Sequence, residues 1–554
     1  GKNTLRIMFE SPINRGLKLF DSQGYDVPVS DNDLSELGGL GKKHISVFTR
    51  KAGYHYGWDW GPRLVTSGIW RPVFIRAWNN AVFRNIHIEQ NDIAVKTANI
   101  AAMLSVESDI SAAATISIRI NDKKVVSQTV SLTEGINRIT IPITIDKPEL
   151  WWPNGMGKQS MYGITARIEI ENKLLDEISA RTGLRTIELV QEPDSAGKSF
   201  YFRINGVPVF MKGANYIPQD IFITRADKRQ YSYMVKSAAD ANMNMLRVWG
   251  GGTYGDDMLY DLCDESGILI WQDFMFACSL FPNYPGYLDN IAREAADNII
   301  RLRNHPCIAL WCGNNECLDA MNWAKNPQWH KEQTYNMPVL EKTYDTIFHH
   351  ILPQAVSSND PKAFYWSSSP SAATGVAADW KSGDVHYWGV WWGMEPFRAY
   401  ARKVPRFASE FGFQALPDPT TLAAFGPLGS LSDPLLRAHQ KHPRGFETIR
   451  AYLEREWPVP PDDSLDAWSY TSQLAQAEGV GLALESHRRS WPRTGGTLYW
   501  QLNDTWPAVS WSSRDYFGRW KALHYRARDV FAPVAVLADA WNDTLSVWIA
   551  ADAP

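Results

Sequence analysis

The pattern of apolar and polar residues changes its period near residue 190. Before that point, short stretches alternate between apolar and polar residues, as in RITIPITID (138–146) and YGITARIEIEN (162–172). This period of two is typical of strands with one buried face. After it, continuous apolar runs alternate with stretches of helical period. The pattern therefore predicts β-sandwiches first and alternating strands and helices afterwards.

Eight apolar segments in the later part of the chain are candidates for the strands of a (β/α)8 barrel. They are residues 209–215, 245–251, 268–274, 308–316, 364–370, 384–388, 403–413 and 496–504. Helices are expected between them, over 227–241, 256–265, 288–303, 338–352 and 465–489. Because helices cover both faces of a parallel sheet, its strands are apolar throughout rather than alternating.

The sequence divides into four expected units. Residues 1–79 are predicted as the later part of a β-sandwich, with strands at 4–9, 44–50 and 73–77, and residues 80–190 as an immunoglobulin-like β-sandwich. Residues 191–530 form the expected barrel, and 531–554 turn to β-structure again. Both ends are expected to be cut from a longer protein. The segment 426–461 receives no role.

Composition narrows the function classes. A net charge of −4 without basic runs argues against a nucleic-acid partner, and no apolar stretch is long enough to cross a membrane. The five cysteines have no zinc-like spacing, so we expect no metal and no cofactor. They are expected to be small buried residues, although one disulfide is possible.

Two of the predicted barrel strands end in a glutamate. Glu316 closes the segment 308–316, and Glu410 lies in 403–413. Active sites of such barrels lie at the C-terminal ends of the strands, so the two carboxylates are expected to meet there. Two facing carboxylates are the minimum equipment for glycoside hydrolysis. Alternatively, either glutamate could be a surface or salt-bridged acid.

Neighbouring residues supply further candidates. Asn315 is expected to present its amide to a sugar hydroxyl, and Arg247 to keep one carboxylate ionised. His386 is a candidate hydroxyl donor. The alternatives are that Arg247 pairs with another acid of the barrel and that His386 forms its hydrogen bonds within the core.

Tryptophans are the most informative feature of the composition. The chain contains 25, and many fall at the predicted strand ends, where flat apolar rings with a polar N–H suit the faces and hydroxyl rims of sugars. The tryptophans at these strand ends and loops are Trp249, Trp271, Trp311, Trp366, Trp388, Trp391, Trp392, Trp500, Trp506 and Trp511. Trp249, Trp388 and Trp500 are the candidates for sugar contacts. Core packing is the alternative for each.

Several motifs resemble glycoside hydrolase family 2. NNE (314–316), SEFG (409–412) and a tryptophan on the eighth strand are similar to that family. The order of the units also resembles it: a jelly-roll sugar-binding-like domain, an immunoglobulin-like domain, a barrel and the start of a further immunoglobulin-like domain. Longer motifs are similar to the β-mannosidases of the family: GYHYGWDWGPRLVTSGIWRP (53–72), RVWGGGTYGDD (247–257), IWQDFMFACSLFP (270–282) and LWCGNNE (310–316).

The resemblance implies roles for these residues. Glu316 would be the general acid/base and Glu410 the nucleophile of a retaining double displacement. The sugar subsite would be lined by Trp249, Asn315 and Trp500. The loop with Trp58 and Asp59 would reach the far hydroxyls of the terminal sugar; an interdomain hydrogen bond is the alternative for Asp59.

The resemblance also implies an exo-acting β-mannosidase. Its partner would be a small oligosaccharide or glycan with terminal β-mannose, and it would act as a monomer or homodimer in the periplasm, in the lysosome or outside the cell. The alternatives are a β-galactosidase, a β-glucuronidase or an exo-glucosaminidase of the same family, or a carbohydrate-binding protein without catalysis.

Overall fold

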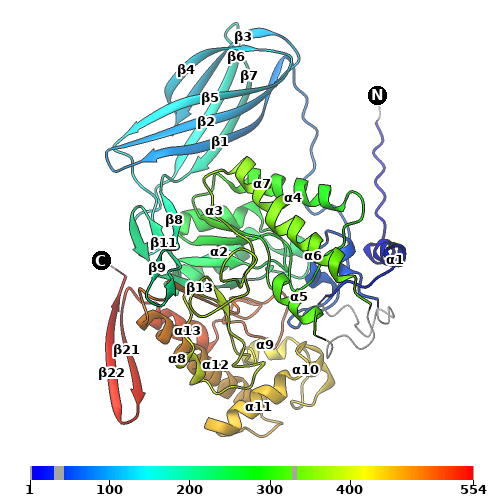
Figure 1. Ribbon diagram of the computed structural model, residues 1–554, viewed down its shortest axis with the longest axis vertical. Coiled ribbons are helices and arrows are strands. Elements are labelled where there is room, and N and C mark those ends of the chain that lie inside the picture. Colours follow the sequence, from blue (N-terminus) through cyan, green and yellow to red (C-terminus); the bar gives the residue numbers. More distant parts are fainter. Residues whose placement is uncertain (1–2, 30–42, 327–333, 553–554) are drawn as a thin grey trace.

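The computed structural model describes residues 3–29, 43–326 and 334–552 (Figure 1). Residues 30–42 of the first predicted unit and 327–333 of the predicted barrel lie outside the described ranges. Within these ranges, no helix combines the length and the apolar character needed to cross a bilayer.

A seven-stranded β-sandwich stands apart from the rest of the chain (Figure 1). One sheet has the order β1-β2-β5 and the other β4-β3-β6-β7, and all pairs are antiparallel. The strands are β1 (Ala81–Ile93), β2 (Thr97–Ser108), β3 (Ala112–Ile120), β4 (Lys123–Leu132), β5 (Gly135–Asp146), β6 (Tyr162–Ile170) and β7 (Lys173–Thr182). The pattern did not predict β4 and β7, because both are edge strands with mostly exposed or half-buried side chains.

The predicted barrel is confirmed, and each of the eight predicted segments contains one strand of a parallel eight-stranded sheet. The strands are β13 (Met211–Tyr216), β14 (Met245–Val248), β15 (Leu269–Asp273), β16 (Ile308–Cys312), β17 (Tyr365–Trp366), β18 (Val385–His386), β19 (Ala408–Glu410) and β20 (Gly496–Tyr499). β13 pairs with both β14 and β20, which brings the first and last strands together. Between β17 and β18, Trp366 Nε1 donates to Asp384 Oδ1 at 2.8 Å.

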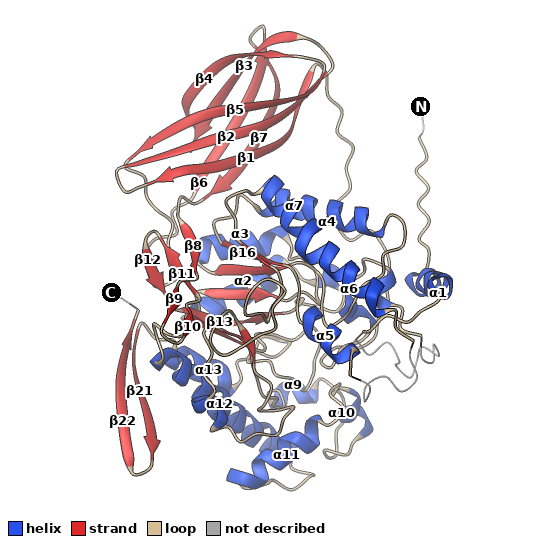
Figure 2. Cartoon of the chain, in the orientation of Figure 1, coloured by secondary structure: helices blue, strands red, loops and turns tan. Residues whose placement is uncertain are grey.

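Helices surround this sheet (Figure 2), and the five predicted helical stretches are confirmed. They correspond to α2 (Lys228–Asp240), α3 (Asp257–Ser266), α4 (Tyr287–Leu302), the run α6 (Met337–Asp345), η5 (Thr346–Ile351) and α7 (Leu352–Asn359), and α12 (Leu465–Arg489). The remaining helices here are α5 (Cys317–Ala324), α8 (Ala399–Arg402), α9 (Pro419–Ala423), α10 (Pro434–Ala438), α11 (Gly445–Glu456) and α13 (Ala522–Val530). α2 begins with a capping box between Asp227 and Gln230, which satisfies backbone N–H groups of its first turn.

The N-terminal end of the barrel is closed by a small sheet of β8 (Ile187–Val190), β11 (Tyr201–Ile204) and β12 (Val207–Val209). Beneath this sheet, the rings of Phe200, Trp271 and Phe407 pack against one another with centroids 5.5 to 6.2 Å apart. A short hairpin of β9 (Pro193–Asp194) and β10 (Gly197–Lys198) precedes it. Only the C-terminal end of the strands is therefore free to form a site.

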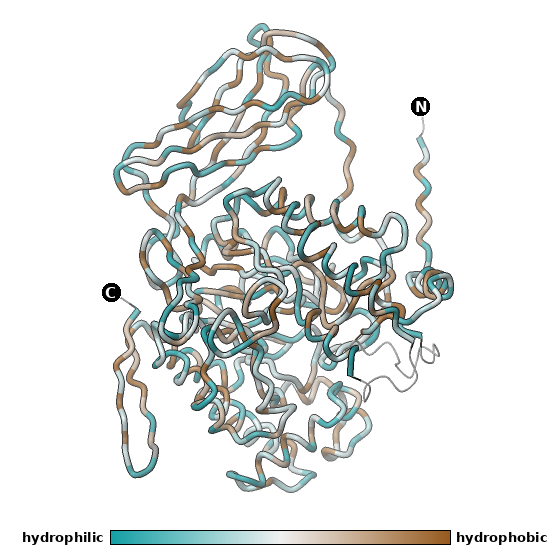
Figure 3. The backbone as a smooth tube through the Cα atoms, viewed as in Figure 1, coloured by the Kyte–Doolittle hydropathy of each residue, from teal (hydrophilic) through white to brown (hydrophobic). Residues whose placement is uncertain are grey.

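The strands predicted for 4–9, 44–50 and 73–77 are wrong, because none of these segments pairs with another described segment. In the N-terminal tail, apolar and polar residues alternate along the tube (Figure 3), but a strand also requires a neighbour for its backbone hydrogen bonds. Phe74 and Ile75, for example, are 82% and 99% exposed. The region contains α1 (Pro12–Gln23), η1 (Ser46–Phe48) and η2 (Gly53–Tyr56) instead.

Two further segments pack on the barrel. The hairpin of β21 (Val534–Trp541) and β22 (Thr544–Ala551) is tied to it where Asp552 accepts from Lys212 Nζ at 2.6 Å and from Arg488 Nη2 at 3.1 Å. The segment 426–461, to which the sequence assigned no role, contains α10 and α11.

Candidate active site

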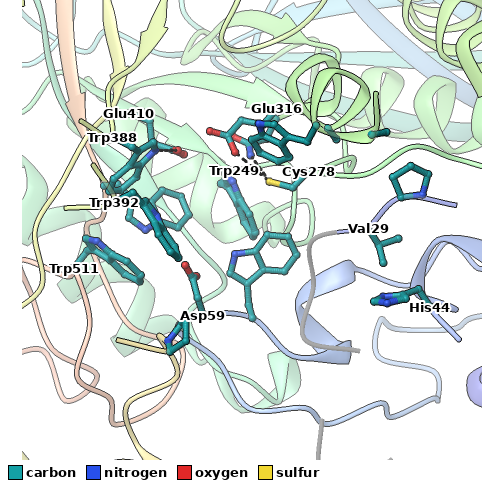
Figure 4. Close-up of a pocket in the computed structure, with 18 of the residues that line it drawn as sticks. Val29, His44, Asp59, Trp249, Cys278, Glu316, Trp388, Trp392, Glu410 and Trp511 are labelled. Carbon is teal, nitrogen blue, oxygen red and sulfur yellow. Dashed lines mark hydrogen bonds between the residues drawn. The ribbon is translucent and has the colours of Figure 1, made fainter. Parts of the chain in front are cut away.

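A cavity of about 920 Å³ opens at the C-terminal end of the barrel strands (Figure 4). Three parts of the chain line it. The N-terminal region supplies Trp58 and Asp59, the barrel supplies both glutamates, and the segment 426–461 supplies Pro443 and Arg444.

The two glutamates predicted to meet do so in this cavity. A carboxylate oxygen of Glu316 and one of Glu410 lie within 4.8 Å of each other. Glu410 is the last residue of β19, whereas Glu316 follows β16 by four residues and precedes α5 with a φ of 55°. Cys278, which contacts Glu316, has a φ of 48°. Non-glycine residues in this backbone region concentrate at functional sites.

Arg247 is buried below the cavity floor and organises it. It forms an ion pair with Asp273 at 2.8 Å and donates from Nη1 to Glu410 Oε1 at 3.2 Å. Its Nη1 also donates to Asn215 Oδ1 at 3.0 Å. Arg247 therefore pairs with a barrel acid and also contacts one of the two glutamates, and its effect on the ionisation of that glutamate stays a prediction.

His386 lies between the two carboxylates and does not line the cavity. Its Nδ1 is 2.8 Å from Glu316 Oε1 and 3.3 Å from Glu410 Oε2. The residue pairs with Glu410 across β18 and β19, which places the ring beside that carboxylate instead of against a sugar hydroxyl. Burial lowers the pKa of His386 to about 4, so the ring is neutral near pH 7.

The two carboxyl groups differ in their hydrogen-bond donors. Burial raises the pKa of both Glu316 and Glu410. Glu410 also receives Arg247 Nη1 and Trp388 Nε1, each at 3.2 Å, and donors to a carboxylate favour its charged form. The two groups titrate as a coupled pair, in which the negative charge of Glu316 raises the pKa of Glu410.

Asn315 connects Arg247 to the far side of Glu316. Its Oδ1 accepts from Arg247 Nη2 at 2.8 Å, and its Nδ2 donates to Cys278 Sγ at 3.2 Å. The Cys278 thiol in turn donates to Glu316 Oε2 at 3.3 Å. The sequence identified Asn315 but treated Cys278 as a small buried residue; its position in the 270–282 motif was the available signal. All five cysteines are buried and free.

Aromatic rings form the walls of the cavity. The ring of Trp249 contacts those of Trp58 and Trp500, with centroids 5.0 and 5.3 Å away. On the opposite side, Trp388 packs 6.2 Å from Trp511. All four predicted tryptophans line the cavity. Trp511 and the half-exposed Trp392, which the sequence placed at strand ends and loops but not among the predicted sugar contacts, line it as well.

Asp59 projects its carboxylate into the same space (Figure 4). Burial, and then the negative charges of Glu410 and Glu316, raise its pKa to about 7. No hydrogen bond joins this carboxylate to another described residue, so the structure offers no interdomain partner for it.

Two groups of side chains in the described residues bring three potential metal ligands together. In one, both oxygens of Asp264 are already engaged, by His305 Nδ1 at 2.6 Å and by the Cys307 N–H at 3.0 Å. The other is the pair of glutamates with His386, where the guanidinium of Arg247 already supplies a positive charge. We interpret neither as a metal site.

Comparisons with known proteins agree with this geometry. A sequence model described as "Glycosyl hydrolase 2 galactose-binding domain-like" matches residues 1–71, and one described as "Glycosyl hydrolases family 2" matches residues 81–185. Beta-mannosidase B of Aspergillus niger is 37% identical over 507 residues, which cover 88% of this chain and 58% of that protein. Beta-mannosidase B of Emericella nidulans is 35% identical, over 97% of this chain and 63% of that protein.

Solved structures give a consistent result. A beta-D-mannosidase from Dictyoglomus thermophilum superposes with a TM-score of 0.87 at 35% identity, over 97% of this chain and 64% of that one. The exo-chitosanase of Amycolatopsis orientalis, at 19% identity and a TM-score of 0.66, shares the fold over 83% of this chain and 54% of that one. The chain thus spans about three fifths of the length of the relatives it matches. From the matched models we conclude that residues 1–71 and 81–185 are domains of the glycoside hydrolase family 2 type, and that the chain as a whole is similar to beta-mannosidases.

Proposed function

We propose that this chain carries the active site of a retaining exo-β-mannosidase, which hydrolyses terminal non-reducing β-D-mannose. The observation that carries the proposal is the approach of the two glutamates, whose nearest oxygens lie within 4.8 Å in a tryptophan-walled cavity. Retaining glycosidases hold their carboxyl groups about 5–5.5 Å apart, whereas inverting enzymes need about 6.5–9.5 Å to admit a water. The similarity to beta-mannosidases supports the choice of sugar.

The proposed reaction has two displacements. Glu410 attacks the anomeric carbon while Glu316 gives its proton to the leaving oxygen, so a covalent glycosyl–enzyme ester forms and an alcohol departs. Glu316, now a carboxylate, then removes a proton from water, which attacks the anomeric carbon and releases Glu410. The two inversions together retain the configuration.

The exo mode is proposed from the wall formed by the N-terminal region. Trp58 and Asp59 lie in the same cavity as both glutamates, where they would meet the hydroxyls of a terminal sugar. The proposal keeps the predicted division into units 1–79, 80–190, 191–530 and 531–554, in which the first unit provides this wall and the third the catalytic groups. We also propose a small glycan with terminal β-mannose as substrate, a monomer or homodimer, and action in the periplasm, in the lysosome or outside the cell.

The test uses a panel of aryl β-glycosides of mannose, galactose, glucuronic acid and glucosamine. We expect the mannoside to be cleaved with a kcat/KM at least about 100-fold above the others, since a site built to bind a hydroxyl rejects sugars that misplace it. Proton NMR during the first minutes should show β-mannose before mutarotation. Initial release of α-mannose, or a preference for another sugar, would refute the proposal.

A further inference from the structure

The hydrogen bonds of His386 fix which of its ring nitrogens carries the proton. On the side away from Glu316, Nε2 lies 3.0 Å from Ser369 Oγ and 3.4 Å from Arg247 Nη1. On the other side, Nδ1 faces Glu316 Oε1 at 2.8 Å and, farther away, Glu410 Oε2 at 3.3 Å. A neutral imidazole carries one N–H, so the ring either donates to Glu316 or accepts from it.

Ser369 cannot donate to Nε2, because Asp384 takes its hydrogen. The Ser369 hydroxyl donates to Asp384 Oδ2 at 2.6 Å. The other groups around that carboxylate also donate to it: Trp366 Nε1 at 2.8 Å, the Ser371 N–H at 3.0 Å and Ser409 Oγ at 2.5 Å. A hydroxyl has a single hydrogen, so Ser369 presents only a lone pair to the imidazole.

Arg247 is the weaker partner of Nε2. The two N–H groups of its Nη1 have nearer acceptors, Asn215 Oδ1 at 3.0 Å and Glu410 Oε1 at 3.2 Å, than His386 Nε2 at 3.4 Å. The hydrogen of the ring therefore lies on Nε2, donated to Ser369 Oγ, and Nδ1 is left with a lone pair.

A lone pair 2.8 Å from Glu316 Oε1 is favourable only if a hydrogen lies between the two atoms. The other carboxyl oxygen of Glu316, Oε2, accepts a hydrogen bond. Asn315 must turn Oδ1 toward Arg247, which can only donate, so its Nδ2 donates to Cys278 Sγ. The thiol hydrogen is then free for Glu316 Oε2. Oε2 is thus the carbonyl oxygen, and Oε1 carries the proton.

We infer that Ser369 and Asp384, by holding His386 in its Nε2–H tautomer, keep the proton of the resting enzyme on Glu316. Both are positioning residues, since they act through His386 without reaching the cavity. The inference rests on the proposed function, in which Glu316 is the general acid. It adds that Ser369 and Asp384, acting through His386, keep Glu316 protonated before the substrate binds.

Other charged groups near His386 and Glu316 also affect the pH profile by which the inference is tested. Glu410, Arg247 and Asp384 influence the His386 ring. The negative charge of Glu316 raises the pKa of Asp59 and of Asp319, and like-charge repulsion acts in both directions. Replacing Ser369 leaves Glu410, Arg247, Asp59 and Asp319 in place and removes one of the donors to Asp384.

The first test is Ser369→Ala. Without the serine oxygen, Nε2 loses its acceptor, and the ring is expected to take the Nδ1–H form and donate to Glu316. A donor favours the carboxylate, so the basic limb of kcat/KM for an aryl β-mannoside should move to lower pH by about one unit. Ser367→Ala is the matched control, because that buried hydroxyl lies beside β17 without a hydrogen-bond partner among the described residues. Its basic limb should stay in place.

The second test is independent of turnover. In the 15N NMR spectrum of histidine-labelled protein, the His386 signals, assigned by their loss in His386→Asn, should show an Nε2–H tautomer in the unaltered chain and Nδ1–H in Ser369→Ala. An Nδ1–H tautomer in the unaltered chain, or an unmoved basic limb in a folded Ser369→Ala, would overturn the inference. Absence of mannosidase activity would instead remove the proposed function, while the spectrum of the unaltered chain would still decide the tautomer.

Discussion

Glu316 and Glu410 are the same residue type in one cavity, yet their surroundings favour opposite protonation states. Glu410 receives an arginine N–H and a tryptophan N–H, neither of which has a lone pair to offer in return. Glu316 receives a thiol, and it lies nearer to the imidazole of His386, which can accept a hydrogen: Nδ1 is 2.8 Å from Glu316 Oε1 and 3.3 Å from Glu410 Oε2. The comparison shows that the hydrogen-bond donors and acceptors around each glutamate determine which one is the acid and which the nucleophile. The residue type alone does not determine these roles.

Their backbones differ as well. Glu410 continues the regular strand β19, so its side chain has the orientation of an inward barrel position. Glu316 lies past the end of β16, in a left-handed conformation at the first residue before α5. That turn lets its carboxyl group approach from another side of the cavity. A non-glycine residue in this region costs of order 1–3 kcal/mol, which the surrounding packing must offset.

The largest effect is expected from removing the nucleophile. Glu410→Gln keeps the volume and the contact with Arg247 but lacks the charge needed to attack, so kcat should fall by roughly 10⁴- to 10⁶-fold. Glu395→Gln is the matched control, because this acid on the outer side of the site pairs with Lys403 at 2.7 Å and does not line the cavity. Turnover of Glu410→Gln within tenfold of the unaltered chain would show that the comparison assigns the wrong nucleophile.

A smaller and substrate-dependent loss is expected from Glu316→Gln. General acid catalysis contributes about 10²- to 10⁴-fold, so a poor leaving group such as methanol should suffer the full loss. A 2,4-dinitrophenyl mannoside needs little protonation, and its first step should be almost unaffected, which a burst of released phenol would reveal. The basic limb of the pH profile should also disappear. An equal loss for both leaving groups would contradict the role of Glu316 as acid.

Much of the barrel and the identity of both glutamates could be predicted from the sequence. Apolar runs ending in acids mark the C-terminal ends of buried strands, and that relation is local along the chain. The contacts that distinguish the acid from the nucleophile join residues that lie far apart in the sequence. Cys278 and His386 reach Glu316 from 38 and 70 residues away, through the closure of the sheet. The sequence thus predicted which acids meet, but could not predict which donors each one receives.

The prediction of strands in the N-terminal region was wrong for a related reason. Its alternation of apolar and polar residues is a local pattern, whereas pairing depends on a second segment at the right place. The loop of that region at Trp58 and Asp59 was nevertheless predicted to reach the site, because the motif 53–72 resembles a known family. The strands β4 and β7 were missed because most of their side chains are exposed or half-buried, so their apolar residues do not alternate regularly along the sequence.

Asp59→Asn is expected to have an intermediate effect on activity. Loss of a charged hydrogen-bond acceptor costs about 1.5–3 kcal/mol, which corresponds to a kcat/KM roughly 10- to 100-fold lower. The variant should also sharpen the main comparison. The charges of both glutamates raise the pKa of Asp59, and like-charge repulsion is mutual, so both limbs of the pH profile should move to lower pH when the Asp59 charge is removed.

The same substitution should stabilise the fold at neutral pH. The pKa of Asp59 is raised to about 7 in the folded chain, above the usual value of an unfolded aspartate, so the folded state binds the proton more tightly. Stability then falls as pH rises from about 4 to about 7 and stays low above it. Thermal unfolding at pH 8 should therefore give a higher Tm for Asp59→Asn, with no difference near pH 4. A lower Tm at pH 8 would show that the carboxylate has a stabilising partner.

The smallest expected effect, and the sharpest test of the comparison, comes from Cys278→Ala. The thiol hydrogen bond lowers the pKa of Glu316 against the effect of burial, and burial keeps the thiol itself protonated by raising its pKa. Its removal should raise the pKa of Glu316 and move the basic limb of kcat/KM to higher pH by about half a unit, opposite in sign to Ser369→Ala.

The size of kcat/KM at the optimum should change by no more than about threefold, because a thiol is a weak donor and Glu316 keeps its contact with His386. Cys307→Ala provides the control, since that buried thiol donates to the Tyr260 carbonyl, away from the cavity. If Cys278→Ala moved the basic limb to lower pH, the thiol would be an acceptor from Glu316. The proton would then lie on Oε2, and the contact with His386 Nδ1 would have to be donated by the ring.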